Sequence, residues 1–173
     1  MVIAVPAIAH AIIFEERPMR QLDRTDRKIL SILQDDSSLA VAEVAARVGL
    51  SQTPCWRRIQ RLRADGVIQR TVSLVHPEAV GLGLTVFIVI EALDHSPEWL
   101  EQFTAAVSRM REVMEVHRMA GDIDYLLRVA VADMAAFDAF YRELIKAVPL
   151  KNVSSHFAME RVKSTTAYPL EAG

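Results

Sequence analysis

Two short helical patterns joined by a tight turn at residues 49–51 constrain the fold of this chain more than any other feature. Apolar residues recur at helical spacing over 41–48 and again over 52–64. Gly49 suits the left-handed backbone conformation that ends a helix, and Ser51 stands where a side chain caps the next one. This arrangement predicts a helix-turn-helix motif.

The helix expected over 52–64 has one apolar face and one polar face. At 100° per residue, Cys55, Ile59 and Leu62 form a single stripe, which should pack on the preceding helices. Arginine offers paired donors to guanine and to phosphate, so the opposite face suits the major groove of DNA. Trp56 could stack on sugar or base edges, or simply cover its neighbours. We expect DNA contacts from Ser51, Gln52, Thr53, Trp56, Arg57, Gln60, Arg61 and Arg70.

Charge is distributed unevenly between the two halves of the chain. Residues 22–76 carry nine Lys or Arg against six Asp or Glu, whereas residues 77–173 carry nine against fourteen. A solvated helix face is the commoner role of surface arginines. Residues 52–70, however, hold five Arg and a single Asp directly after a helix-turn, which favours a nucleic-acid partner.

A first helix is expected from Asp23, with Ile29 and Leu30 among its apolar positions. After the third helix, Asp65 and Gly66 turn the chain, and residues 67–75 alternate well enough for a two-stranded wing. A winged helix-turn-helix DNA-binding domain is therefore predicted over residues 22–76. Residues 1–21 form an extension ahead of it; its apolar part is too short to span a bilayer and lacks the basic start of a secretion signal.

The second half follows a different pattern, in which apolar strands alternate with amphipathic helices. Residues 77–83 are punctuated by Pro and Gly and read as a hinge. The order after the hinge is βαββαβ, a ferredoxin-like arrangement, so the whole chain belongs to the α+β class. We expect residues 84–173 to form this second domain, with strands at 84–93, 113–119, 125–131 and 153–162 and helices from Pro97 and Met134.

A short acidic turn stands out within the second half. Asp122 and Asp124 lie two residues apart and share a face if the segment is extended, while Gly121 permits close approach of a ligand to the backbone. Such a turn could hold the ammonium and carboxylate groups of an amino acid. The residues alone favour an ordinary hairpin, in which the aspartates accept local backbone N–H groups.

Three segments together resemble the leucine-responsive/asparagine-type (Lrp/AsnC) family of feast-or-famine transcriptional regulators. They are LDRTD at 22–26, GLSQTPCWRRIQRL at 49–62 and MAGDIDYLLRV at 119–129. The likeness covers residues 22–170. Within the family, HSPEWLEQF at 95–103 and SSHFAMERVKSTTAYP at 154–169 look most like regulators of amino-acid catabolism, including those that respond to cysteine.

The resemblance implies homodimers built through the C-terminal sheets, further assembly into larger oligomers, and a small amino acid bound between dimers. It raises the ligand role of the acidic turn above the hairpin alternative. The site it implies contains Met119, Gly121, Asp122, Asp124, Ser154, Ser155 and His156. In the best-known member a Tyr stands at the position of His156, so the choice of ligand does not carry over.

Two other classes of function are weighed against this one. An enzyme is disfavoured, because the five histidines are scattered without a nucleophile or metal-binding pattern and no catalytic residue, metal site or cofactor is indicated. The single cysteine, Cys55, is expected to be a small buried residue in a reducing, cytoplasmic protein. An architectural protein that wraps double-stranded DNA without a small-molecule effector remains the main alternative.

Overall fold

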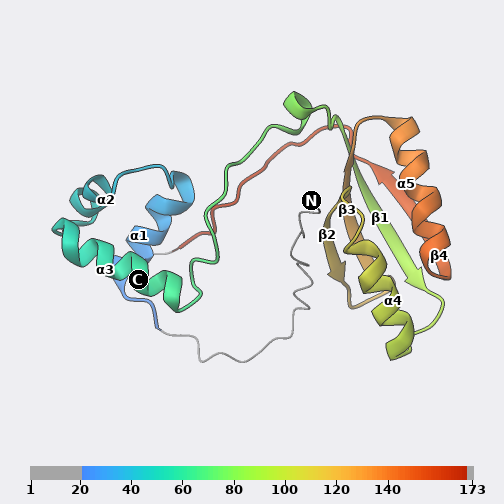
Figure 1. The fold of residues 1–173 in the computed structure, drawn as a ribbon, viewed down its shortest axis with the longest axis horizontal. Coiled ribbons are helices and arrows are strands. Elements are labelled where there is room, and N and C mark those ends of the chain that lie inside the picture. The colour runs from blue at the N-terminus through green and yellow to red at the C-terminus, as the bar shows by residue number, and fades with distance from the viewer. Residues whose placement is uncertain (1–20, 171–173) are drawn as a thin grey trace, which may run out of the picture. The chain divides into compact units, whose positions relative to one another are not determined.

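The computed structural model describes residues 21–170, which form two compact units (Figure 1). The N-terminal unit holds residues 21–74 together with 162–170, and the C-terminal unit holds residues 75–161. The extension expected at residues 1–21 lies outside the described residues apart from Gln21. No helix within residues 21–170 has the length and apolar character needed to cross a membrane.

Three helices build the N-terminal unit: α1 (Arg24–Asp35), α2 (Val41–Val48) and α3 (Gln52–Ala64). The ends of α1 and α2 follow from local chemistry. The Asp23 carboxylate accepts the backbone N–H of Asp26 at 2.7 Å and so caps the start of α1. Gly49, with φ of 72°, ends α2 as expected.

The capping role expected of Ser51 is wrong in one respect. Ser51 occupies the N-cap position of α3 with an extended backbone, but its side chain makes no capping hydrogen bond. Ser51 is exposed, and N–H groups at a helix start that lack a side-chain cap can be satisfied by solvent. The position is thus determined by the chain reversal at Gly49 rather than by a bond from Ser51.

The core of this unit confirms the expected apolar stripe of α3. Cys55, Ile59 and Leu62 are each at most 3% exposed and pack with the apolar sides of α1 and α2. The fully buried members are Ile29, Leu30, Val44, Ala45, Cys55, Ile59 and Leu62. Burial raises the pKa of the Cys55 thiol, which fits a packing role for that residue.

The structure assigns no strand to residues 67–75, where the two-stranded wing was expected. Residues 69–76 are irregular, and Arg70 is exposed within them. The only turn signal, Asp65 and Gly66, precedes the whole segment, so VIQRTVSLV has no Gly, Pro, Asn or Asp at which to reverse. A two-stranded ribbon is also marginal without further cover.

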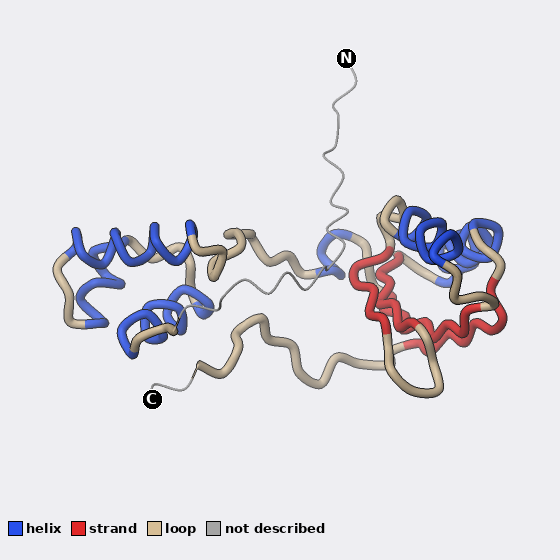
Figure 2. Tube along the Cα trace, turned by 90° about the horizontal axis from the view of Figure 1, so that it is seen from below, coloured by secondary structure: helices blue, strands red, loops and turns tan. Residues whose placement is uncertain are grey.

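The C-terminal unit has the predicted βαββαβ order. A short 3₁₀ helix, η1 (Pro77–Val80), lies in the expected hinge and precedes β1 (Leu84–Ala92), α4 (Pro97–Val107), β2 (Val113–Arg118), β3 (Tyr125–Val131), α5 (Met134–Ala147) and β4 (Leu150–Phe157). The four strands form one antiparallel sheet in the order β2-β3-β1-β4. Both helices lie on the same side of this sheet (Figure 2).

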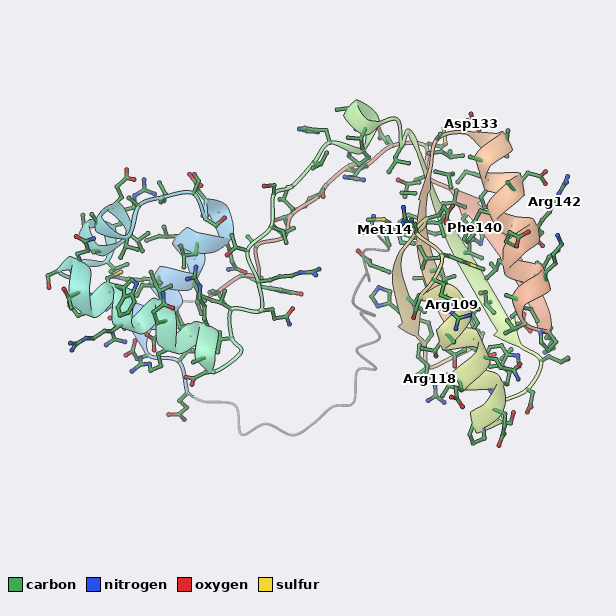
Figure 3. The ribbon with its side chains drawn as sticks, viewed as in Figure 1. Arg109, Met114, Arg118, Asp133, Phe140 and Arg142 are labelled. Atoms are coloured by element: carbon green, nitrogen blue, oxygen red, sulfur yellow. The ribbon has the colours of Figure 1, made fainter. Side chains whose placement is uncertain are left out.

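The helices close the core because each presents large apolar side chains to the sheet. Phe140 extends from α5 toward the strands (Figure 3), and the ring centroids of Phe103 and Tyr125 lie 4.6 Å apart. Ser96 caps α4 as expected, since its hydroxyl accepts the backbone N–H of Trp99 at 3.2 Å. Trp99 also donates its indole N–H to the carbonyl of Pro149 at 2.8 Å, which ties α4 to the start of β4.

The last strand begins and ends earlier than expected. We predicted a strand over 153–162, but β4 runs over Leu150–Phe157. Its neighbour decides the limits: β4 pairs with β1 from Ala92 opposite Leu150 to Val86 opposite Phe157. Beyond Phe157 only one more backbone bond forms, from the N–H of Ala158 to the carbonyl of Thr85, because β1 itself begins at Leu84.

The residues after β4 contact the N-terminal unit. The backbone N–H of Tyr168 donates to Oε1 of Gln34 at 2.8 Å, and the Gln34 amide donates to the carbonyl of Tyr168 at 3.2 Å. Leu170 packs against the three-helix core. The segment that sequence alone grouped with the C-terminal domain thus forms part of the packing of α1.

This contact predicts that Leu170→Ala destabilises the N-terminal unit. Leu170 is half-buried, so the loss should be about 1–2 kcal/mol, which accelerates amide exchange in α1 roughly 5- to 30-fold. Tyr168→Ala is the matched control, because the side chain of Tyr168 is 78% exposed and its bonds to Gln34 use the backbone. Hydrogen exchange with mass spectrometry measures both; equal α1 protection in Leu170→Ala and wild type would contradict the contact.

Candidate DNA interface and effector site

The first half of α3 presents a continuous polar surface. Ser51, Gln52, Thr53 and Arg57 are exposed, and the indole of Trp56 is 50% exposed beside them. The apolar stripe on the opposite side of the helix fixes this orientation. These residues lie as the sequence predicted, on the outward face of the second helix of a helix-turn-helix, which is the face that enters the major groove in such motifs.

Gln60 and Arg61 are placed differently from that expectation. Both are half-buried, and Arg61 turns toward α1, where its Nη2 lies 3.2 Å from Oδ2 of Asp26. Arg70 is exposed in the irregular segment after α3, with no wing to position it. The structure therefore groups the first five predicted DNA contacts on one exposed surface; Gln60 is half-buried, and Arg61 and Arg70 lie apart from that surface.

The partner of Arg61 is a buried carboxylate that the sequence analysis did not single out. Asp26 is 1% exposed, and its Oδ1 accepts Nη1 of Arg58 at 2.7 Å. The same Nη1 lies 2.6 Å from Oδ2 of Asp23. A signal was present in the sequence: Asp26 stands three, four and seven residues before Ile29, Leu30 and Leu33, so it occupies the apolar stripe of its helix.

The hydrogen bonds between Asp23, Asp26 and Arg58 shift the pKa values of Asp23 and Arg58. The backbone N–H of Asp26 and then the guanidinium of Arg58 hold the pKa of Asp23 below its usual value. The hydrogen bonds from Arg58 to Asp23 and Asp26 raise the pKa of Arg58 further above its ordinary range. Asp23 and Arg58 therefore carry opposite charges at neutral pH.

The acidic turn between β2 and β3 is closed by backbone bonds. The N–H of Met119 donates to the carbonyl of Asp124 at 2.8 Å, and the N–H of Asp124 donates to the carbonyl of Ile90 at 3.0 Å. Gly121 has φ of 135°, a conformation that side chains disfavour, so glycine is required at this point. Met119 is 39% exposed at the end of β2, next to the turn.

The two aspartates of the turn have different surroundings. Oδ2 of Asp124 accepts the backbone N–H of Ala92 at 2.8 Å, and its Oδ1 lies 3.9 Å from Nε2 of His95. Asp122 is exposed, and its side chain has no hydrogen bond or ion pair within the described residues. Asp124 thus has the local backbone role that the hairpin alternative anticipated, whereas Asp122 is free to meet a ligand.

The three predicted residues on β4 do not reach this turn within one chain. Strand β1 separates β4 from β3, and Ser154 pairs with Val89, which pairs in turn with Leu126 of β3. Ser154 and His156 lie on the sheet face opposite the helices, whereas Ser155, opposite the buried Ile88, points toward the helices. A pocket that used both groups would need residues from a second copy.

The sheet face away from the helices has an apolar centre and a polar margin. Phe87, Val89 and Leu126 lie on the two central strands, with the Phe87 side chain 37% exposed. On one side Nη2 of Arg128 donates to Oε1 of Glu115 at 2.5 Å, which lowers the pKa of that carboxyl. The residues of this open face are Thr85, Phe87, Val89, Glu91, Glu115, His117, Leu126, Arg128, Ala130, Asn152, Ser154 and His156.

Metal coordination has no candidate in the part of the chain that the structure describes. Residues 21–170 contain no group of three or more His, Cys, Asp or Glu side chains placed to hold an ion. The carboxylates of Asp124 and Asp23 instead accept the backbone N–H groups of Ala92 and Asp26, respectively.

Helix-turn-helix geometry followed by a separate α+β unit defines a DNA-binding transcriptional regulator with a ligand-binding domain. Residues 22–69 match the model for winged helix-turn-helix DNA-binding domains, and residues 85–168 match the Lrp/AsnC ligand binding domain. The chain belongs to the Lrp/AsnC family of transcriptional regulators. The resemblance drawn from its three sequence segments is confirmed.

Individual relatives agree over nearly their whole length. The chain is 48% identical to the DNA-binding transcriptional activator DecR of Escherichia coli K12, over 87% of this chain and 99% of that protein. An AsnC family regulator from Agrobacterium tumefaciens is 56% identical, with a TM-score of 0.84 over 86% of this chain and 97% of that one. A Neisseria meningitidis regulator solved in complex with L-methionine is 35% identical, with a TM-score of 0.82 over 87% and 97%.

Proposed function

We propose that this regulator reads an operator through the first half of α3. The observation that carries the proposal is the cluster of exposed polar side chains, Gln52, Thr53, Trp56 and Arg57, on a helix whose other face is fully packed. Arg57 has no ion pair within the described residues, so its planar guanidinium is free for a guanine edge or a phosphate. Ser51 at the helix start, and Gln60 and Arg70 beyond it, would contact the DNA backbone on either side, whereas Arg61 is held by Asp26.

Arg57→Ala is expected to weaken operator binding by about 1–3 kcal/mol, roughly fivefold to 150-fold, if Arg57 contacts a guanine. A phosphate contact would instead lower the slope of log affinity against log salt by about one. Fluorescence anisotropy at several salt concentrations distinguishes these results, and Arg109→Ala, on the C-terminal unit, controls for the change in net charge. Operator binding unchanged in the double variant Arg57→Ala, Arg61→Ala would reject this surface.

We further propose that the effector is a small amino acid bound at the turn between β2 and β3. Support comes from the free carboxylate of Asp122, from the backbone opened by Gly121, and from the L-methionine complex of the Neisseria relative. The ammonium group would lie on Asp122 or on Oδ1 of Asp124, and the carboxylate on N–H groups near Gly121. Met119 would line the site, and Ser154, Ser155 and His156 would come from another copy.

Such a site predicts charge-dependent binding of amino acids. Asp122→Asn or Asp124→Asn should lose a charge-assisted hydrogen bond worth about 1.5–3 kcal/mol, roughly a ten- to hundredfold loss of affinity. The asparagine oxygen at position 124 keeps an acceptor for the N–H of Ala92, so the fold is spared. Glu101→Gln, an exposed carboxylate on α4, is the matched control.

Titration calorimetry with L-methionine first, and then with the other amino acids, provides the measurement. Unchanged affinity in both aspartate variants would place the pocket elsewhere. No binding of any amino acid to the wild-type chain would favour the architectural alternative, in which the protein organises DNA without an effector. A positive result would support a cytoplasmic regulator of amino-acid metabolism, because the effector would report on the supply of that metabolite.

Self-association is proposed to use the open face of the sheet. Its apolar centre and polar margin have the layout of a protein interface. In one chain the central strands leave Phe87 exposed and Val89 and Leu126 partly exposed. In this proposal a second copy would supply the β4 residues that the acidic turn does not reach within one chain.

Phe87→Arg should therefore convert the dimer to a monomer, because it buries an unpaired charge at the centre of the interface. Met134→Arg is the control: Met134 is 56% exposed at the start of α5, on the helix side of the sheet. Analytical ultracentrifugation at micromolar concentration gives the masses. A Phe87→Arg variant with wild-type mass would place the interface on another surface.

A further inference from the structure

The carboxylate of Asp26 is buried at the contact between α1 and α3, so it is not available to touch DNA directly. Asp26 is 1% exposed and lies among the apolar residues of the three-helix core. Both of its partners, Arg58 and Arg61, come from α3. A lone buried charge is strongly unfavourable, so the folded unit keeps these two arginines in place around it.

The bonds form a bridge rather than a single pair. Nη1 of Arg58 donates to Oδ2 of Asp23 at 2.6 Å and to Oδ1 of Asp26 at 2.7 Å, while Nη2 of Arg61 lies 3.3 Å and 3.2 Å from the two Asp26 oxygens. Two arginines thus meet two aspartates, and the cluster is neutral. The apolar stripe of α3 packs the helix against α1 and α2, but apolar contacts are not directional. The charged bridge fixes its rotation and its position along α1.

We propose that Asp26 is a positioning residue for DNA recognition, which sets operator specificity without touching DNA. The proposal rests on the function proposed above, in which the exposed face of α3 reads the operator. Arg57 and Trp56 precede Arg58 directly on the helix, so any rotation of α3 moves them relative to the bases. Asp26 also keeps Arg58 and Arg61 from turning freely toward phosphates, contacts that would add affinity for every sequence equally.

Asp26→Asn tests this, because it keeps the size of the side chain and removes its charge. Asp35→Asn is the matched control: it makes the same change in net charge on an exposed carboxylate at the end of the same helix. Affinities are measured by fluorescence anisotropy for a duplex selected from a random pool on the wild-type protein and for a scrambled duplex. The readout is the ratio of the two affinities, which a smaller folded fraction would not change.

The two variants should separate clearly. In Asp35→Asn the added charge should strengthen binding to both duplexes by a similar factor, leaving the ratio as in wild type. In Asp26→Asn binding to the scrambled duplex should strengthen at least as much, while binding to the selected duplex falls, so that the ratio drops about tenfold or more. An equal ratio in the two variants would overturn the proposal.

Arg58→Lys gives an independent reading if Asp26→Asn fails to fold. The substitution keeps the cluster neutral but replaces the planar guanidinium that joins Asp23 to Asp26 with a single flexible ammonium. The ratio should again fall while binding to the scrambled duplex stays at the wild-type level. A wild-type ratio in Arg58→Lys would count against positioning by this bridge.

Failure of this inference is distinguishable from failure of the proposed function. If Arg57→Ala weakens binding to the selected duplex while Asp26→Asn keeps the ratio seen in Asp35→Asn, α3 reads DNA and Asp26 does not position it. If Arg57→Ala leaves both affinities unchanged, the exposed face of α3 is not the reading surface, and the proposal for Asp26 falls with it.

Discussion

The packing of α3 on α1 and α2 is the constraint on which the N-terminal unit depends. Three residues of α3, Cys55, Ile59 and Leu62, supply its buried stripe, so the remaining positions are available for solvent or DNA. Apolar packing through this narrow stripe holds α3 against the core but does not fix its orientation. The ion pairs of Asp26 with Arg58 and Arg61 fix that orientation. A helix that must hold its side chains against base edges needs both, because misplaced donors lose their hydrogen bonds.

In the C-terminal unit, helices cover the sheet on one side only (Figure 2). Helices α4 and α5 bury alternate residues of β1, and the other alternate residues are left on the open face. Ion pairs such as Glu115 with Arg128 occupy the margin of that face, and apolar side chains occupy its centre. The same alternation that builds the core therefore leaves a face with an apolar centre open in the single chain.

Two segments of chain connect the units, one on each side of the sheet domain in sequence. The first runs from α3 through η1 to β1, and the second leaves β4 and ends at Leu170 in the three-helix core. The second connection starts from the strand that carries Ser154 and His156. Along this second connection, Gln34 of α1 is hydrogen-bonded to the backbone of Tyr168.

The sequence alone determined the bounds of those elements that apolar spacing and neighbouring turn residues define. The bounds of α3 and β3 follow from apolar spacing and flanking turn residues, and the family follows from three short segments. Tertiary structure alone decided three other features, because each depends on a partner distant in the chain. β4 ends at Phe157, opposite the start of its neighbour β1. One oxygen of Asp124 accepts the N–H of Ala92, and Arg61 turns to Asp26. Periodicity places a side chain on a face of its own element, but the partner that it meets depends on how distant elements pack together.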